Sequence, residues 1–497
     1  MIEHNLPALQ VVIPLVAAPL CVVIRNARAV YGMTFVVAWL TFACAVALFI
    51  RVADSGDIVY AMGGWVAPWG IEYRVDQLSG FVLVLVAGMG AVVATWAPRG
   101  LAAEVAPSKR HLFWALYLLC LSGLLGIAIT GDLFNVFVFL EISALSSYGL
   151  IALGGRRKAL PAAFRYLIMG TIGATFILIG IGLMYMMTGT LNMADMATRL
   201  PVDGHRTVLV AFAFLTVGIS LKAALFPLHA WLPDAYAYAP STVSALLAAT
   251  ATKVSVYILL RFFLSVFGAD FAFGGMGVGQ ILMVLAVVGM FVASAAAIFQ
   301  GNLKRMLAYS SVAQIGYMVL GISLASTAGL TGGIVHLFNH GLIKGGMFMA
   351  TGCILLRAGS VERDELAGIG KTMPWTMMAW TLGGLGLIGV PGTAGFVSKW
   401  YLLQAALEQG HVWLAVLLLL SSLLAVAYVW RVVEQAYFKK PAGIGVGARE
   451  APLSMLLPTL VVIGLTLFFG FWTDFPAGAA GAAAESLLGG ALMGGTS

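Results

Sequence analysis

Residues 221–236 read LKAALFPLHAWLPDAY and lie in a predominantly apolar run that extends from 207 to 237. As one helix this run would be roughly 46 Å long, whereas the hydrocarbon core of a bilayer is about 30 Å thick. Pro227 removes a backbone hydrogen bond near the middle of the run. The stretch therefore predicts a membrane-spanning helix that is broken, with Lys222 just before the break.

A second run, from 375 to 409, has the same character and contains GLIGVPGTAGFVSKW at 386–400. Its length as one helix would be roughly 52 Å, and Pro391 falls inside it. Interrupted helices at corresponding positions of two halves are a sequence indicator of a transporter binding site. The two breaks together predict such a site in the middle of the membrane.

The composition excludes a water-soluble globule. Of the 497 residues, 61% are hydrophobic and 9% are charged, whereas roughly a quarter are charged in soluble proteins. The net charge of +7 does not indicate nucleic-acid binding here, because basic residues in a polytopic membrane protein orient its loops. We predict an all-α integral membrane protein of about 14 transmembrane helices. The predicted spans are 8–24, 31–53, 77–97, 112–129, 132–153, 164–188, 207–237, 240–266, 278–300, 304–326, 330–357, 375–409, 413–437 and 452–473.

The fourteen spans form a single polytopic membrane domain, 1–497, because no long linker separates independent units. Spans four to eight, residues 112–266, and spans nine to thirteen, residues 278–437, make two sets of five. Because five is odd, the second set must run inverted relative to the first. The broken helix is the fourth member of each predicted repeat.

Two segments outside the spans carry their own predictions. IVYAMGGWVAPWGIEYRV at 58–75 alternates apolar and polar residues around Gly63-Gly64, which favours a short external β-hairpin. The alanine- and glycine-rich tail after Phe475 is expected to be loosely ordered.

The basic residues predict the orientation. Of the 27 Lys and Arg residues, 18 fall on one side of the predicted spans and five on the other. Cytoplasmic loops retain Lys and Arg, so the first side is predicted to be cytoplasmic and both termini external. The remaining four are lysines inside the membrane.

These lysines are Lys222, Lys253, Lys344 and Lys399, and the acid Glu141 also falls inside a span. A lysine at mid-membrane costs roughly 2.5 to 3.5 kcal/mol to insert, so such residues are candidates for function. One acid cannot neutralise four cations. A carboxylate about 4 Å away stabilises an ammonium by roughly 4 kcal/mol at an effective dielectric of 20. Making or breaking a Glu141–Lys222 pair would therefore change how tightly the lysine holds its proton.

HLFNHGLIKGG places His336, His340 and Lys344 four residues apart, on one face of a helix. Histidine titrates near neutral pH, which favours a proton relay. A packing role and a zinc site remain alternatives, although no third zinc ligand is evident.

Motifs for other chemistry are absent from the sequence. The four cysteines stand singly, and neither a phosphate-binding loop nor a dinucleotide fingerprint is present. We therefore predict no cofactor, no metal site and no catalysis by this chain itself.

Several stretches resemble the antiporter-like subunits shared by respiratory complex I and the Mrp multisubunit cation/proton antiporters. They are TGDLFNVFVFLEI at 130–142, residues 221–261, NLKRMLAYSSVAQIGYM at 302–318, HLFNHGLIKGGMF at 336–348 and GTAGFVSKWYL at 392–402. The resemblance covers roughly residues 75 to 440. Within the family, TGDLFNVFVFLEI and ATKVSVYILLR look most like the D subunit of the Mrp complexes.

The resemblance implies fourteen helices, inverted repeats and a charged axis near mid-membrane that conducts protons. Glu141 would be the essential acid, Lys222 the lysine of the first broken helix, Lys253 the central lysine and Lys399 the terminal one. His336, His340 and Lys344 would line the relay between them.

The leading hypothesis is a proton-translocating subunit of a multisubunit Na⁺(K⁺)/H⁺ antiporter in a bacterial inner membrane. Its partners would be other membrane subunits, and its ions protons and Na⁺ or K⁺. The alternative is a proton-pumping subunit of an NADH:quinone oxidoreductase or a membrane hydrogenase-type complex. An independent uptake carrier is a third possibility, which the four lysines fit less well.

Overall fold

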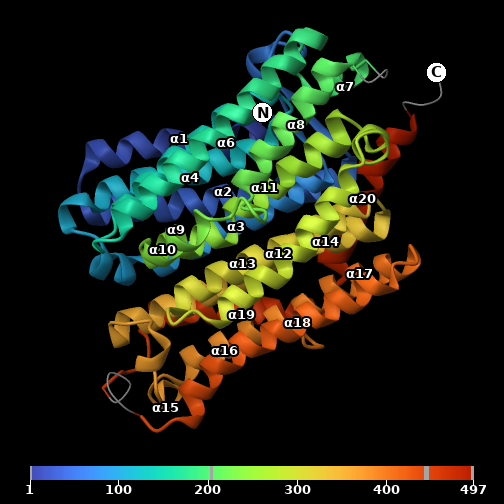
Figure 1. The fold of residues 1–497 in the computed structure, drawn as a ribbon. Helices are drawn as coiled ribbons and strands as arrows, with labels where there is room; N and C mark the ends of the chain where they lie inside the picture. Colours follow the sequence, from blue (N-terminus) through green and yellow to red (C-terminus); the bar gives the residue numbers. More distant parts are fainter. Residues whose placement is uncertain (1–2, 202–204, 442–446, 494–497) are drawn as a thin grey trace.

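The computed structural model describes residues 3–201, 205–441 and 447–493, and almost all of them are helical. Long helices lie side by side, with α12 to α14 between the first group of helices and α16 to α18 (Figure 1). The first ten helices are α1 (Leu6–Ile24), α2 (Ala27–Ser55), α3 (Gln77–Glu104), α4 (Arg110–Ile129), α5 (Leu133–Ala152), α6 (Ala159–Thr188), α7 (Met193–Arg199), α8 (Arg206–Lys222), α9 (Leu232–Tyr238) and α10 (Ser241–Ala249). The others are α11 (Ala251–Leu260), α12 (Val278–Ile298), α13 (Leu303–Ser323), α14 (Thr327–Ala358), α15 (Ile369–Thr372), α16 (Pro374–Ile388), α17 (Ala394–Glu408), α18 (Val412–Val433), α19 (Leu453–Phe471) and α20 (Asp474–Met493).

The protein is a multi-pass integral membrane protein. By length and composition, twelve helices in the described part of the chain can cross a membrane. The two other predicted spans, 207–237 and 375–409, are the two that were predicted to be broken. The structure divides them into α8 and α9 and into α16 and α17, each too short to count as a full span.

Both breaks lie at the predicted prolines. Between α8 and α9 the chain makes hydrogen-bonded turns through Pro227, and Ala224 has a φ of 57°. Between α16 and α17 it passes Pro391, with Gly389 and Gly392 both at a φ of 85°. Glycine adopts this left-handed conformation without steric cost, so the glycines allow the chain to turn where the proline ends the helix.

A third interruption was not predicted, since span 240–266 was expected to be continuous. The structure divides it into α10 and α11 at Thr250, whose φ and ψ are −125° and −56°. ATATKV at 249–254 contains neither proline nor glycine, so the sequence gives no ordinary signal for this kink.

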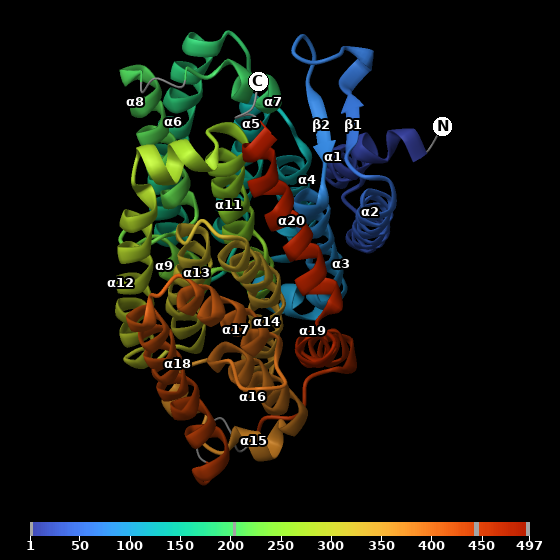
Figure 2. The same cartoon turned by 90° about the vertical axis from the view of Figure 1, so that its right-hand side faces the viewer.

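The predicted hairpin is present: β1 (Ile58–Ala61) pairs antiparallel with β2 (Glu72–Val75). It stands at one end of the helices, and α15 lies at the opposite end (Figure 2). The Tyr60 hydroxyl donates to the Asn5 side chain at 3.0 Å, so the start of the chain also lies at the hairpin end. We call the opposite end, with the predicted 18 basic residues, the basic end.

The expectation of a loosely ordered tail is wrong for residues up to Met493. Residues after Asp474 form α20, which packs against α14 and α3 and buries Ala480, Ala483 and Ala484. Alanine has the best helix propensity, and its small side chain lets α20 approach its neighbours closely. The glycines made the segment look flexible, but tertiary packing determines its structure.

The close approach of α17 to the end of α16 generates a stability prediction. A Cβ at Gly395 would collide with the carbonyl oxygen of Gly386. Gly395→Val should therefore destabilise the protein by about 1 to 3 kcal/mol, the usual cost of overpacking, and lower its melting temperature in detergent. Gly182→Ala on α6 is the control, because a Cβ there has no neighbour within 4 Å. Equal melting temperatures for the two variants would contradict the tight contact.

Candidate functional site

The predicted relay residues lie on α14, in which every residue from 329 to 354 is buried. His336, His340 and Lys344 are each at most 1% exposed. Around α14 pack α3, α10, α13, α16, α17, α19 and α20. Any polar group on this helix must therefore find its partners inside the protein.

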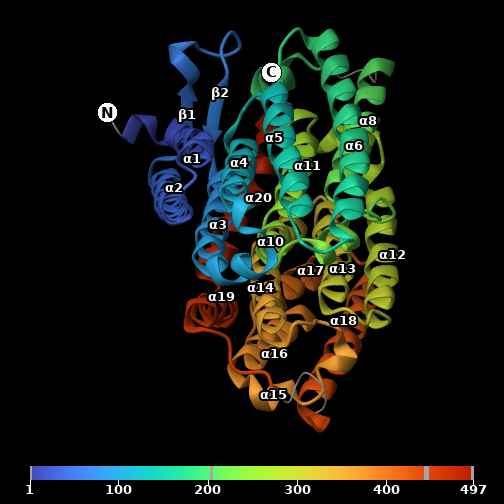
Figure 3. The same ribbon diagram turned by 90° about the vertical axis from the view of Figure 1, so that its left-hand side faces the viewer.

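Glu141 and Lys222 form the ion pair that the sequence suggested. Lys222 is the last residue of α8, and its Nζ lies 3.2 Å from Oε1 of Glu141 on α5. Their side chains are 6% and 23% exposed, so the carboxylate is the more accessible partner. These helices belong to a row in which α5 packs on α6, α6 on α8 and α8 on α11 (Figure 3).

The break after Lys222 is held in place by Trp231. Its indole N–H donates to the carbonyl oxygen of Leu221 at 3.0 Å, which satisfies an acceptor at the end of α8. The indole ring also stacks on Tyr166 of α6, with centroids 3.9 Å apart and planes 2° from parallel. Pro227 itself is exposed.

Lys253 is fully buried near the start of α11, beside the kink at Thr250. Its Nζ donates to the Ala248 carbonyl at 2.5 Å and to the Thr252 hydroxyl at 3.3 Å. The kink releases the Ala248 carbonyl from the regular helical pattern, so the same irregularity supplies the lysine with an acceptor.

Lys344 is also fully buried, and both of its partners come from α13. Its Nζ donates to the Leu307 carbonyl at 2.9 Å and to the Ser310 hydroxyl. In the described structure it forms no ion pair with a carboxylate.

The two histidines stack face to face, with ring centroids 5.8 Å apart and planes 6° from parallel. His336 Nδ1 lies 2.8 Å from the Ser398 hydroxyl of α17. Within the described residues, His336 Nε2 and both ring nitrogens of His340 have no hydrogen-bond partner. Unpaired buried nitrogens are costly, so these atoms are suited to exchange protons with water or with moving side chains.

Lys399 reaches back from α17 to the end of α16. Its Nζ donates to the carbonyls of Leu387 and Ile388, both at 2.9 Å, and to the Ser422 hydroxyl at 3.0 Å. The C-terminal carbonyls of a helix carry partial negative charge, which stabilises the ammonium. The Tyr317 ring lies 4.7 Å from Nζ and adds a cation–π contact.

The structure brings most of the predicted residues together, with one gap. His336 joins the Lys399 region through Ser398 and through Tyr317, whose ring lies 5.5 Å away. Lys253 and Lys344 both lie close enough to His340 to interact with it electrostatically. In the described chain, no hydrogen bond links Lys222 to Lys253.

Sequence reasoning missed the uncharged partners of the lysines. Three lysines, Lys253, Lys344 and Lys399, each have a hydroxyl beside Nζ. The hydroxyls belong to Thr252, Ser310 and Ser422 respectively. These residue types are common in apolar helices, where they usually bond their own backbone. Of the three, Thr252 is next to its lysine in the sequence, directly before Lys253.

Lys304 also departs from its prediction, because it was placed with the loop residues of the basic end. It is fully buried, donates to the Ala239 carbonyl at 3.1 Å and lies 3.8 Å from Glu104. Asp234 pairs with Arg165 at 2.8 Å and with Arg305 at 3.5 Å. Ion pairs thus connect helices at the basic end.

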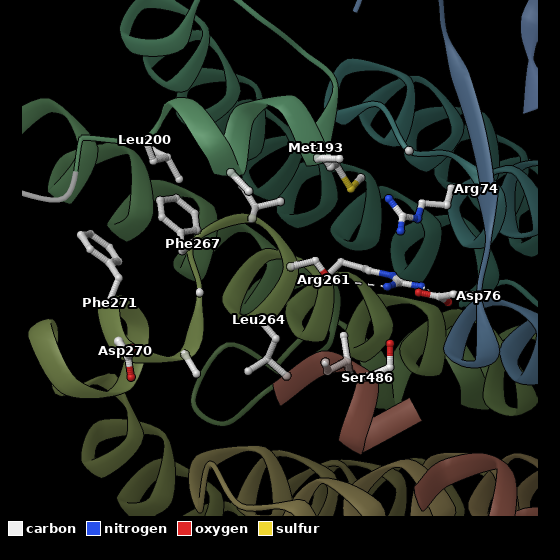
Figure 4. Close-up of a pocket in the computed structure, with 18 of the residues that line it drawn as sticks. Arg74, Asp76, Met193, Leu200, Arg261, Leu264, Phe267, Asp270, Phe271 and Ser486 are labelled. Atoms are coloured by element: carbon white, nitrogen blue, oxygen red, sulfur yellow. Dashed lines mark hydrogen bonds and ion pairs between the residues drawn. The ribbon is translucent and has the colours of Figure 1, made fainter. Parts of the chain in front are cut away.

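At the hairpin end a cavity of about 750 Å³ opens between the hairpin, α7 and the segment after α11 (Figure 4). Its inner wall holds Arg261, which pairs with Asp76 and donates to the Tyr257 hydroxyl at 2.9 Å. Burial acts to raise the pKa of Asp76, but the Arg261 guanidinium and hydrogen bonds from Ser79 outweigh it and lower that pKa to about 2. Asp132, near the same cavity, caps α5 by accepting from the Asn135 N–H at 2.7 Å.

The described residues contain no group of three or more His, Cys, Asp and Glu side chains that could hold a metal ion. The lysine partners are the Glu141 carboxylate, backbone carbonyls and hydroxyls, which all accept from an ammonium donor. The arrangement can bind, release and pass protons.

Comparison with known proteins places this geometry in a family. The family described as "NADH:quinone oxidoreductase/Mrp antiporter, TM" matches residues 130–425. The N subunit of the NADH-quinone oxidoreductase of Desulforudis audaxviator is 43% identical over 474 residues, which cover 92% of this chain and 94% of the relative. The D subunit of the Na(+)/H(+) antiporter of Alkalihalophilus pseudofirmus is 29% identical, with 94% of each chain covered.

A solved structure agrees with these relatives. A chain in the Mrp complex from Dietzia sp. DQ12-45-1b has a TM-score of 0.91 at 27% identity, with 98% of both chains covered. The protein is therefore a polytopic, antiporter-like membrane subunit. It belongs to the family shared by NADH:quinone oxidoreductases and Mrp antiporters, as the sequence motifs predicted.

The Arg261–Asp76 pair generates a prediction about stability and pH. Asp76→Asn leaves a buried guanidinium without its counter-charge, so we expect a loss of about 3 to 5 kcal/mol at pH 7. Because the folded-state pKa of Asp76 is depressed, the wild-type advantage is complete above the unfolded pKa near 4 and is lost as the pH falls toward 2. Thermal unfolding in detergent between pH 2 and 7 measures both effects.

Asp57→Asn is the control for this experiment. Its ion pair with Arg74 is exposed, so the variant should lose less than about 1 kcal/mol. A loss for Asp76→Asn that is no larger than the loss for Asp57→Asn would contradict the assignment.

Proposed function

We propose that this chain conducts protons across a membrane along the line from Glu141 and Lys222 through Lys253 and the α14 residues to Lys399. The observation that carries the proposal is a hydroxyl beside the Nζ of Lys253, Lys344 and Lys399. A hydroxyl accepts a hydrogen bond from an ammonium and donates one to a neutral amine. Each lysine can therefore lose its proton without leaving its nitrogen unpartnered.

The ion pair at the α8 break starts this path. Glu141 is partly exposed and can exchange protons with water, whereas Lys222 is almost enclosed. While Glu141 is ionised it stabilises the charge on Lys222. Protonation of Glu141 removes that stabilisation and favours release of a proton from Lys222 toward the interior.

Between the two breaks, repulsion among cations couples the charge states of neighbouring groups. Lys253 and Lys344 both interact with the ring of His340, and neither has a carboxylate partner in the described structure. A proton that arrives on one lysine disfavours a charge on the next. The stacked histidines offer unpaired nitrogens between these lysines and Ser398, which is next to Lys399.

The structural frame of the proposal is the pair of inverted repeats, 112–266 and 278–437. In each repeat a broken helix presents a lysine beside its break: Lys222 in one, Lys399 in the other. The excess of basic residues assigns the basic end to the cytoplasm, and the hairpin end with both termini to the outside of a bacterial plasma membrane.

We propose a redox-driven complex as the first assignment for the assembly in which this chain works. The 43% identity over nearly the whole length to the N subunit of an NADH-quinone oxidoreductase supports it. In that setting electron transfer in partner subunits would drive the protons. The order of the two hypotheses from the sequence is thereby reversed.

A subunit of a Na⁺(K⁺)/H⁺ antiporter is the second candidate. The likeness to a chain of a solved Mrp complex, with a TM-score of 0.91, favours it, as does the nearly full-length similarity to the D subunit of a Na(+)/H(+) antiporter. Both assignments share the proton path through this chain and differ in the source of energy.

The proton path predicts the effect of removing its first pair. In everted vesicles that contain the assembled complex, Glu141→Gln and Lys222→Met should each reduce proton movement at least tenfold, measured with a fluorescent ΔpH probe. Glu141→Asp keeps the charge and should retain part of the activity. The control is Glu365→Gln, an exposed carboxylate at the basic end. Wild-type proton movement in both loss-of-charge variants, with normal assembly, would refute the path.

The source of energy is tested separately on the same vesicles. An electron donor such as NADH should generate ΔpH, and flavin or iron–sulfur proteins should copurify with this chain. If NaCl or KCl instead dissipates a preformed ΔpH, and the preparation lacks redox proteins, the antiporter assignment replaces the redox assignment. Transport by the isolated chain in liposomes would favour an independent carrier.

A further inference from the structure

A second cavity, of about 370 Å³, opens at the basic end of the molecule. The loop between α5 and α6, the end of α9 and the loop between α12 and α13 surround it. It lies where the two predicted repeats meet, since α9 and α13 pack side by side (Figure 1). No residue of the proton path lines it.

The cavity is strongly basic. Arg156, Arg157, Lys158 and Arg305 line it, against the single acid Glu362. The Glu362 carboxylate already accepts a hydrogen bond from the Asn302 side-chain amide at 2.6 Å. The lining therefore presents a surplus of positive charge to whatever occupies the space.

The cations of this cavity are incompletely paired. In the described part of the chain, none of Arg156, Arg157 and Lys158 forms an ion pair with a carboxylate. Arg305 pairs with Asp234 through Nη2, but its Nε is buried and has no partner among the described residues. A guanidinium with a spare donor is suited to a phosphate oxygen.

Apolar side chains flank the same cavity on the side of the membrane. Leu160 and Phe164 lie four residues apart on α6 and are 64% and 61% exposed. Phe299, which precedes the α12–α13 loop, is 81% exposed. A free phosphate would gain nothing from these residues, whereas acyl chains would cover them.

We infer that this cavity binds the phosphate of an anionic phospholipid, with its acyl chains along the exposed face of α6. Basic pockets between transmembrane helices at the cytoplasmic surface recognise such headgroups. Arg305 contacts both Asp234 of α9 and the cavity, so a bound lipid would fix α9, the second part of the broken helix that follows Lys222. The lipid site thus lies beside the proton path without being part of it.

The experiment compares two triple variants of the assembled complex. Arg156→Gln/Arg157→Gln/Lys158→Gln removes the lining charges. Lys109→Gln/Lys371→Gln/Lys440→Gln removes exposed charges at the same end, outside the cavity. Each complex is purified and its retained phospholipid measured by native mass spectrometry. Its melting temperature is then measured with phosphatidylglycerol, with phosphatidylcholine and with inorganic phosphate.

We expect wild type and the control to retain an anionic phospholipid and to be stabilised by phosphatidylglycerol but not by phosphatidylcholine. The lining variant should bind phosphatidylglycerol roughly a hundredfold more weakly, because each basic residue near an anionic headgroup contributes about fivefold. Equal retention by the two triple variants would overturn the site. Stabilisation by inorganic phosphate alone, without retained lipid, would overturn the lipid as its occupant.

Discussion

The four lysines of the predicted membrane spans have one carboxylate, Glu141, among them, and the rest of the structure accommodates this imbalance. Lys222 takes the carboxylate, while the other three bind backbone carbonyls and hydroxyls. Carbonyls inside a regular helix already accept from the residue four positions on, so Lys344 shares the Leu307 carbonyl with the backbone of α13. Interrupted helices release them, and two of these lysines, Lys253 and Lys399, bind at such interruptions.

The interrupted helices therefore supply carbonyl acceptors to the lysines, and the lysines stabilise the interruptions by satisfying those carbonyls. At α16 the freed carbonyls of Leu387 and Ile388 accept from Lys399, and at Thr250 the Ala248 carbonyl accepts from Lys253. At α8 the indole of Trp231 takes the equivalent place. Removing a lysine would leave carbonyls unsatisfied as well as removing a proton carrier, so stability and transport are coupled at these positions.

The sequence predicts the features that depend on residue types with strong local effects. Pro227 and Pro391 mark the two broken helices, Gly63-Gly64 marks the hairpin, and intramembrane charge marks the candidate site. The Glu141–Lys222 pair follows from charge balance.

Features that depend on tertiary contacts could not be predicted in this way. The kink at Thr250 has no proline or glycine, and it depends on Lys253 and on dense packing around α10 and α11. A count of loop charges does not reveal that Lys304 is buried. Its partners, Glu104 and the Ala239 carbonyl, lie on other segments of the chain. The packing of α20 depends on neighbours that its own composition does not specify.

The stack of Trp231 on Tyr166 has a consequence for the speed of transport. With the rings 3.9 Å apart and the indole bonded to Leu221, the segment after Lys222 is attached to both α6 and α8. A swing of α9 would have to separate these rings, and rearrangements of whole helices take microseconds to milliseconds. Rotation of the Lys222 side chain needs no such separation of the rings. The contacts of Trp231 thus favour a proton step in which the Lys222 side chain moves while the helices keep their positions.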